Sequence, residues 1–169
     1  MRHNTTAAII CCLFLTNGAI AQLTDLDVDW KELQVPPPAT FRTDKLVPIE
    51  MPRYVSVKVG LDPDSLTISP DGIVRYVAVA QSDSGNINAV FEGIWCRAGE
   101  VKTYARAGND RKWNAVPNPQ WRKLGDSQPS MHALALARQG VCDGRSASAH
   151  SPQAIILKLK QPAADGSQR

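Results

Sequence analysis

The sequence lacks the motifs that identify most catalytic and nucleotide-binding sites. It has no Gly-rich phosphate loop, no G-x-S-x-G nucleophile motif and no C-x-x-C pair among its four cysteines. Only three histidines occur in 169 residues, so few side chains are suited to acid–base chemistry near neutral pH. These absences argue against an enzyme of a familiar class, and no cofactor is predicted.

Residues suited to metal binding are also few and poorly spaced. A zinc site would need His132 and His150 to converge with Cys96 and Cys142, at no recognised spacing. Three aspartates lack the spacing of an EF-hand and are better explained as turn residues: Asp62, Asp64 and Asp71. No metal site is predicted.

Long hydrophobic runs are absent except near the N-terminus. Residues 7–15 form an apolar core that follows Arg2 and is too short to span a bilayer. The small-x-small sequence that ends at Ala21 is typical of a signal-peptidase site. We predict a signal peptide over residues 1–21, cleavage after Ala21 and a periplasmic location; a buried N-terminal helix is the alternative. The mature chain is predicted to have no transmembrane segment.

Cysteines are scarce in the remaining chain. Cleavage would remove Cys11 and Cys12 and leave Cys96 with Cys142. In an oxidising compartment, a single pair predicts one disulfide. This bridge would close a loop of about 47 residues, worth roughly 4 kcal/mol in the chain-entropy treatment.

Charge is nearly balanced overall but unevenly distributed. Residues 22–92 hold 11 acidic and 6 basic residues, a net of −5, whereas residues 93–169 hold 5 acidic and 12 basic, a net of +7. A basic half can indicate nucleic-acid or anionic-lipid binding. The basic residues are scattered, however, so we favour attraction between two halves of one fold and predict no nucleic-acid partner.

The mature chain is predicted to be one α+β domain with an N-terminal arm. Residues 22–52 carry an acidic patch around Trp30 and the proline run 36–38, and indicate an extended arm that Trp30 anchors. Residues 53–160 form the domain, and residues 161–169 are expected to be disordered. β-branched residues between turn signals predict strands over 53–59, 66–69, 73–81, 86–96 and 101–107.

Short turns and two C-terminal apolar segments complete the expected fold. Four-residue turns predict a curved antiparallel meander of four to five strands. The segment 129–140 has helical spacing, a cap at Asp126 or Ser127 and a stop at Gly140. Residues 151–160 begin with Ser151 and a proline, which favours a short helix, although their alternation also fits a strand.

The turns also predict which residues face each other. A loop over 82–85 places Arg75 directly across from Glu92, an opposite-charge pair that would neutralise a buried carboxylate. Counting across the next turn places Gly93 opposite Tyr104, whose ring would cover the glycine. We therefore predict Arg75 and Glu92 as a structural ion pair rather than as catalytic groups.

Several motifs run in an order that resembles a known family. They are "WKE" at 30–32, "DPDSLTISPDGIVRY" at 62–76, "FEGIWC" at 91–96 and "TYA" at 103–105, with Trp113, Trp121 and Cys142 after them. Together they resemble the cryptic-neisserial-protein-like (CNP-like) family of small exported proteobacterial proteins. The resemblance implies a single periplasmic or envelope domain. It offers no catalytic residues to carry over.

Three classes of function remain open from the sequence. The first is a non-catalytic binding module, in which Trp113 and Trp121 of the long loop, with Trp30, contact a cell-wall ligand or an envelope protein. Packing of these tryptophans under the loop is the structural alternative. The second is an envelope scaffold that docks a partner through its acidic arm. The third and least favoured is a hydrolase that uses Glu92.

Overall fold

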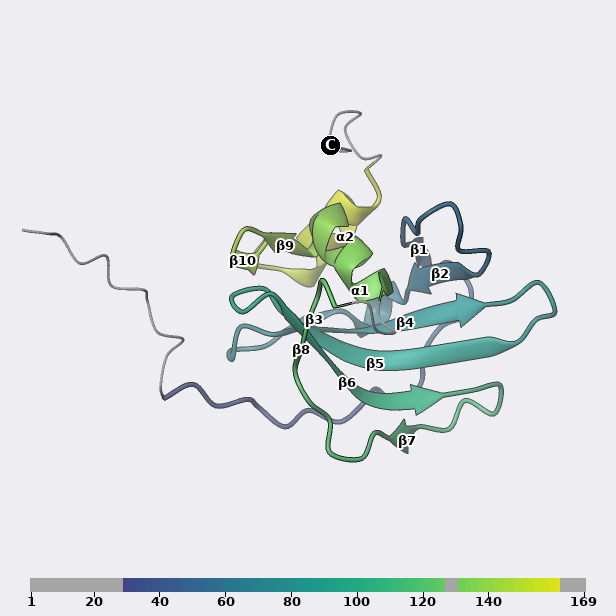
Figure 1. Cartoon of the computed structure of the whole chain (residues 1–169), viewed down its shortest axis with the longest axis horizontal. Coiled ribbons are helices and arrows are strands. Elements are labelled where there is room, and N and C mark those ends of the chain that lie inside the picture. The colour runs from purple at the N-terminus through teal and green to yellow at the C-terminus, as the bar shows by residue number, and fades with distance from the viewer. Residues whose placement is uncertain (1–28, 127–130, 162–169) are drawn as a thin grey trace, which may run out of the picture.

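The fold is an open antiparallel sheet with two C-terminal helices on one face (Figure 1). A computed structural model describes residues 29–126 and 131–161. The predicted signal peptide, the residue Ser127 proposed as a cap, and the C-terminal residues 162–169 lie outside the described residues.

The sheet has eight strands, arranged β1-β2-β4-β5-β6-β7, with β3 paired to β4 and β8 paired to β6. Its strands are β1 (Val47–Pro48), β2 (Lys58–Leu61), β3 (Thr67–Ile68), β4 (Val74–Gln81), β5 (Ile87–Trp95), β6 (Glu100–Ala107), β7 (Asn114–Ala115) and β8 (Arg122–Lys123). The other elements are a 3₁₀ turn (Pro63–Ser65), α1 (Met131–Leu136), a wider helical turn (Ala137–Val141), the small hairpin of β9 (Cys142–Asp143) and β10 (Ser146–Ala147), and α2 (Pro152–Leu159).

The α+β class and the central meander β4–β5–β6 are confirmed, but the sheet has more strands than the four to five expected. The additional strands are two-residue pairings, too short to leave an alternating pattern in the sequence. β1 lies inside the segment that was expected to be arm alone. The first predicted strand also begins late, at Lys58, because Val55 donates to the Pro52 carbonyl and closes a turn.

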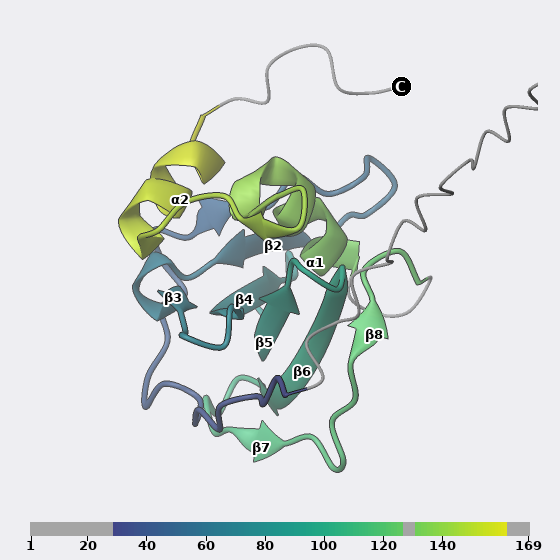
Figure 2. The same cartoon turned by 90° about the vertical axis from the view of Figure 1, so that its left-hand side faces the viewer.

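Both faces of the central strands are covered, which explains their nearly continuous apolar sequences. On β4, Val74 and Tyr76 face the helices, whereas Val77 and Val79 face the other side. The two views in Figures 1 and 2 show the helices on one face and the N-terminal segment crossing the other. The sheet is therefore the middle layer of three.

The helix layer is fixed by caps and by the disulfide. Ser151 accepts a hydrogen bond from the Ala154 N–H, so the helical alternative for this segment is correct. Gly140 has φ of 144°, which a glycine tolerates and which ends the preceding helical turns. Just beyond it, Cys142 is bonded to Cys96 with a Cα–Cα distance of 5.6 Å, as predicted.

The predicted register of the β4–β5 hairpin is wrong by one residue. The backbone N–H of Ser82 donates to the Asn86 carbonyl, so the hairpin loop has three residues, 83–85. It ends at Gly85, which has φ of 81°. Arg75 therefore faces Gly93, and Glu92 faces Tyr76. A shift of one residue moves a side chain to the other face of a sheet. Consequently, Arg75 and Glu92 lie on opposite faces and do not form the predicted ion pair.

The register of the next hairpin also differs from the prediction. Gly93 faces Lys102, and a β-bulge at Phe91/Glu92 makes Tyr104 the extra residue on β6. The Tyr104 ring nevertheless lies over Gly93, where an added Cβ would come within 2.8 Å of the hydroxyl. The expected covering of this glycine is therefore correct, although the direct pairing is not.

Candidate functional site: the sheet face beneath the N-terminal arm

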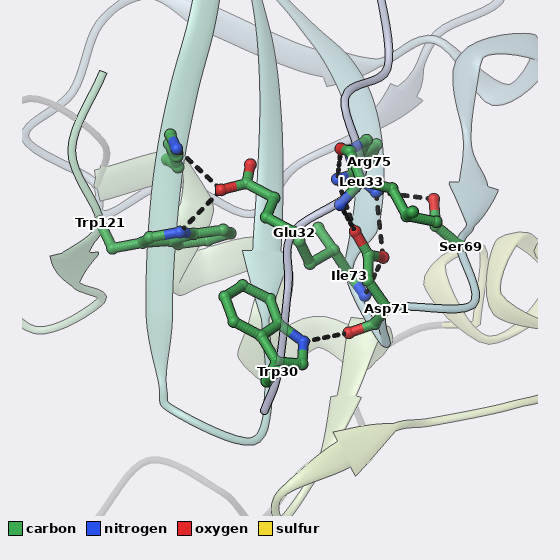
Figure 3. Close-up of polar contacts among 9 residues, drawn as sticks. Trp30, Glu32, Leu33, Ser69, Asp71, Ile73, Arg75 and Trp121 are labelled. Atoms are coloured by element: carbon green, nitrogen blue, oxygen red, sulfur yellow. Dashed lines mark hydrogen bonds and ion pairs between the residues drawn. The ribbon is translucent and has the colours of Figure 1, made fainter. Parts of the chain in front are cut away.

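The N-terminal arm lies extended across the sheet face that the helices leave open. Its contacts with the domain run from Trp30 to Thr43, and they are made by β4, by the turn before β4 and by the segment between β6 and β7. Figure 3 shows the first part of this path, where the arm passes between Trp121 and Arg75. The arm is thus bound as a linear segment along this face of the sheet.

Three tryptophans from three distant segments meet at the start of this path. Trp30 stacks on Trp95 of β5 with ring centroids 3.9 Å apart and an angle of 11° between the planes. Trp121 lies 6.4 Å from Trp30 and 5.9 Å from Trp95. Trp95 is buried, whereas Trp30 and Trp121 remain partly exposed. We call these three residues the tryptophan site.

A nearly buried ion pair lies beside the tryptophan site. Glu32 of the arm accepts from Lys102 at 2.8 Å and from Nε1 of Trp121 at 3.2 Å. The Glu32 and Lys102 side chains are each 13% exposed. The ammonium of Lys102 also lies 5.5 Å from the Trp121 ring centroid, within cation–π range. Glu32 therefore links the arm to both β6 and the loop after β7.

A second ion pair holds the next residue of the arm. Arg75 and Asp71 are joined at 2.8 Å, and both side chains are 1% exposed. The Leu33 N–H donates to Asp71, and Arg75 donates to the Leu33 carbonyl, so both backbone groups of Leu33 are satisfied. Asp71 also accepts the Trp30 indole N–H through its backbone carbonyl at 2.8 Å. This pair recognises the backbone of the arm.

Both members of this pair stay charged. Burial alone would raise the pKa of Asp71, but hydrogen bonds from Arg75 and from the Leu33 and Ile73 N–H groups outweigh it and lower that pKa. Burial likewise opposes the charge on Arg75, and its contacts with Asp71 raise its pKa instead. The Tyr104 ring lies 5.6 Å from the guanidinium, and burial raises the pKa of its hydroxyl, which stays protonated.

Trp113 supports the arm at a separate point. Its indole N–H donates to the Pro38 carbonyl at 2.8 Å, and its ring lies 5.2 Å from that of Phe41. Phe41 is 5% exposed and packs with Phe91 in the smaller of two apolar clusters. Of the three tryptophans singled out from the sequence, the structure thus brings Trp30 and Trp121 together and places Trp113 under the arm.

Glu92 lies on the opposite face, beneath α1, in a largely buried polar network. It is 0% exposed and accepts from the Tyr76 hydroxyl at 2.9 Å and the Thr103 hydroxyl at 2.7 Å. Nε2 of His132, on α1, lies 2.8 Å from the same carboxylate. Burial by itself would raise the pKa of Glu92, but the contacts from His132, Thr103 and Tyr76 outweigh it and lower that pKa.

The chemistry of this network is structural. An ionised carboxylate accepts hydrogen bonds only, so it holds the hydroxyls and the imidazole in fixed positions and joins α1 to the sheet. The link between Glu92 and His132 was missed because 40 residues separate them and no local pattern signals the contact.

Two further findings concern membrane-spanning helices and metal ligands. In residues 29–126 and 131–161, no helix is long and apolar enough to cross a bilayer. Over the same residues, histidine, cysteine and carboxylate side chains form no group of three or more that is arranged to hold a metal ion.

Comparison with known proteins gives the family. Residues 25–160 match the CNP1-like family over most of the chain. The chain is also 30% identical over 128 residues to cryptic neisserial protein 1 of Neisseria gonorrhoeae (strain ATCC 700825 / FA 1090), covering 65% of this chain and 62% of that protein. The match thus spans less than two thirds of the relative. No solved structure matches the chain. The protein belongs to the CNP1-like family.

Proposed function

We propose that the protein is an exported component of the cell envelope that acts as a non-catalytic binding or interaction module. Its partner surface is the tryptophan site together with the exposed edge of the arm that crosses it. The observation that carries this proposal is the convergence of Trp30, Trp95 and Trp121 from three segments at one partly exposed point.

Such a cluster has the composition of a protein interaction site. Tryptophan offers a large contact area with few rotatable bonds and is enriched among residues that dominate binding energy. The rings of Trp30 and Trp121 are already fixed by stacking and by their indole hydrogen bonds, so little side-chain freedom would be lost on binding. A partner with an aromatic ring or sugar face would extend the stack.

Export is supported by the disulfide between Cys96 and Cys142. Disulfides persist in oxidising compartments such as the periplasm and are rare in the cytosol. This bridge fits the signal peptide expected over residues 1–21.

The two alternatives receive less support from the geometry. A scaffold that docks a partner through the acidic arm alone would use Glu32 for that partner, yet Glu32 is paired with Lys102 of the protein's own sheet. A hydrolase that uses Glu92 would need the carboxylate to reach a substrate, yet Glu92 is 0% exposed.

Site-specific photo-cross-linking in cells tests the binding proposal. In one variant, a photoreactive amino acid would replace Lys31, which is exposed beside Trp30. In a control variant, it would replace Tyr54, which is 77% exposed and contacts Met131 on the helix side. We expect a discrete adduct from position 31 and none of the same mass from position 54. Identical adducts from both positions, or none from position 31, would contradict the proposal.

Export has its own test. Osmotic shock should release the protein from cells, and N-terminal sequencing should find Gln22 as the first residue. Retention of residues 1–21 on a cytosolic protein would contradict the exported location.

A further inference from the structure

A second site lies on the other side of the loop that carries Trp121. The strands β7 and β8 both pair with β6, β7 at Ala105 and Arg106 and β8 at Glu100 and Val101. The chain between them must therefore bow away from the middle of β6. It leaves a cavity of about 310 Å³, here called the basic pocket, lined by Val101, Thr103, Arg106, Val116, Pro117, Asn118, Pro119, Gln120, Arg122, Lys123 and Leu124.

The walls of the basic pocket are held in place at several points. The Val116 N–H donates to the Tyr104 carbonyl at 2.9 Å, and the Leu124 N–H donates to the Gly99 carbonyl at 2.9 Å. Between these anchors, the prolines at 117 and 119 limit the backbone freedom of the loop. Trp121 holds the same loop in place through the hydrogen bond that its indole N–H donates to Glu32 of the arm. The pocket is thus largely formed before any ligand binds.

The charge of the basic pocket is of one sign. Three basic side chains line it, and none of its lining residues is acidic. Lys123 is neutralised by Glu100 at 2.8 Å, but within the described part of the chain Arg106 and Arg122 make no ion pair. Both arginines are exposed on the surface and available to a ligand.

The remaining lining adds neutral polar groups and an apolar wall. Asn118 and Gln120 each offer an amide that can donate and accept. Thr103 also lines the pocket, and its hydroxyl donates a hydrogen bond to Glu92. Such a lining suits a ligand that has an anionic group on a small polar body.

We infer that the basic pocket binds a small ligand through an oxyanion, either a carboxylate or a phosphate, recognised by the arginines that line it, Arg106 and Arg122. The guanidinium fork matches both groups and forms charge-assisted hydrogen bonds to them. The cavity volume lies at the lower end of the range for small-molecule sites. This site is separate from the tryptophan site, and the inference does not rest on the proposed function.

NMR titration of the mature, oxidised full chain tests the inference. Inorganic phosphate and acetate would be added in separate experiments at constant ionic strength, with sodium chloride replaced. We expect saturable shifts of the Thr103, Asn118 and Gln120 amide signals with at least one anion. The anion that binds with the higher affinity shows whether the ligand carries a phosphate or a carboxylate. Absence of saturable shifts with both anions would overturn the inference.

Two double variants distinguish specific binding in the pocket from non-specific attraction of anions to a positively charged protein. Arg106→Gln with Arg122→Gln should weaken binding roughly tenfold or more, because a charge-assisted hydrogen bond is lost at each position. Arg53→Gln with Arg138→Gln removes the same charge from exposed positions outside the lining and should leave the affinity unchanged. Equal weakening in both double variants would overturn the inference.

A third variant tests the loop that lines the pocket without changing any charge. Asn118 has φ of 46°, a backbone conformation that glycine adopts without strain. Asn118→Gly therefore removes the amide while leaving the loop intact, and it should weaken anion binding by a few-fold. Unchanged affinity in this variant would contradict the placement of the ligand against the loop.

Discussion

Replacing Glu92 by glutamine keeps the shape of the side chain but removes its charge and turns one oxygen into a donor. In the native protein this carboxylate is 0% exposed and accepts from Tyr76, Thr103 and His132. After Glu92→Gln, at least one of these donors faces the new NH₂ group. We expect Glu92→Gln to destabilise the fold.

The size of the effect follows from the hydrogen bonds involved. A buried donor left without a partner costs about 1–3 kcal/mol, and hydrogen bonds to a charged group exceed neutral ones by about 1 kcal/mol each. Part of this is regained because a neutral side chain is easier to bury. A net loss of about 3 kcal/mol in the free energy of unfolding is expected at pH 7, a large part of the 5–15 kcal/mol typical of a domain.

The same network predicts a pH dependence. The pKa of Glu92 is lower in the folded protein than its ordinary value of 4.5. The carboxylate thus stabilises the fold fully above pH 4.5, and this contribution is lost as the pH falls through the lower folded value. The difference in stability between the native chain and Glu92→Gln should therefore shrink below about pH 4.5.

Urea denaturation of oxidised protein at pH 7 and at pH 3.5 measures both effects. Glu50→Gln serves as the matched control, because Glu50 is exposed and its side chain makes no ion pair within the described residues. The control variant should have the same free energy of unfolding as the native chain at pH 7. A Glu92→Gln variant as stable as the control at pH 7, or a deficit that does not change with pH, would refute the role given to this network.

Three further variants probe the arm, the sheet and the disulfide. Trp30→Ala removes the stack on Trp95 and should lower the free energy of unfolding by about 2 kcal/mol and expose the arm to protease, whereas Val35→Ala, at an exposed arm position, should do neither. Gly93→Ala places a Cβ 2.7 Å from the Ile73 side chain and should cost about 1–3 kcal/mol in urea denaturation, while Gly108→Ala, where the space is open, should be nearly neutral. Joint replacement of Cys96 and Cys142 by alanine should lower the stability by about 4 kcal/mol, and native protein denatured without reductant should show no reactive thiol from this pair.

Local sequence signals were sufficient for the central strands and the helices. The segments β4, β5 and β6 are rich in β-branched residues between turn signals, and α2 begins with a serine cap followed by proline. These features act over a few residues, so the sequence displays them directly. The partner of Cys96 was predictable for a different reason, since only one other cysteine remains after residue 21.

Register and long-range contacts were not predictable in the same way. A three-residue and a four-residue loop fit "SDSG" equally well, yet the choice decides which face Arg75 occupies. The contacts that build the site and the network beneath α1 join residues far apart, such as Glu32 with Lys102 in the first and Glu92 with His132 in the second. These pairings depend on where whole elements pack, which a local pattern does not encode.

The position of Trp30 is the most direct test of the account, because the arm-covered sheet face and the tryptophan site both depend on it. The measurement is a nuclear Overhauser spectrum of the mature, oxidised protein with its tryptophans assigned. The stacking of Trp30 on Trp95 at 3.9 Å predicts strong cross-peaks between the two indole rings. Random-coil shifts for Trp30, with no cross-peaks to Trp95, would contradict the docked arm and the site built on it.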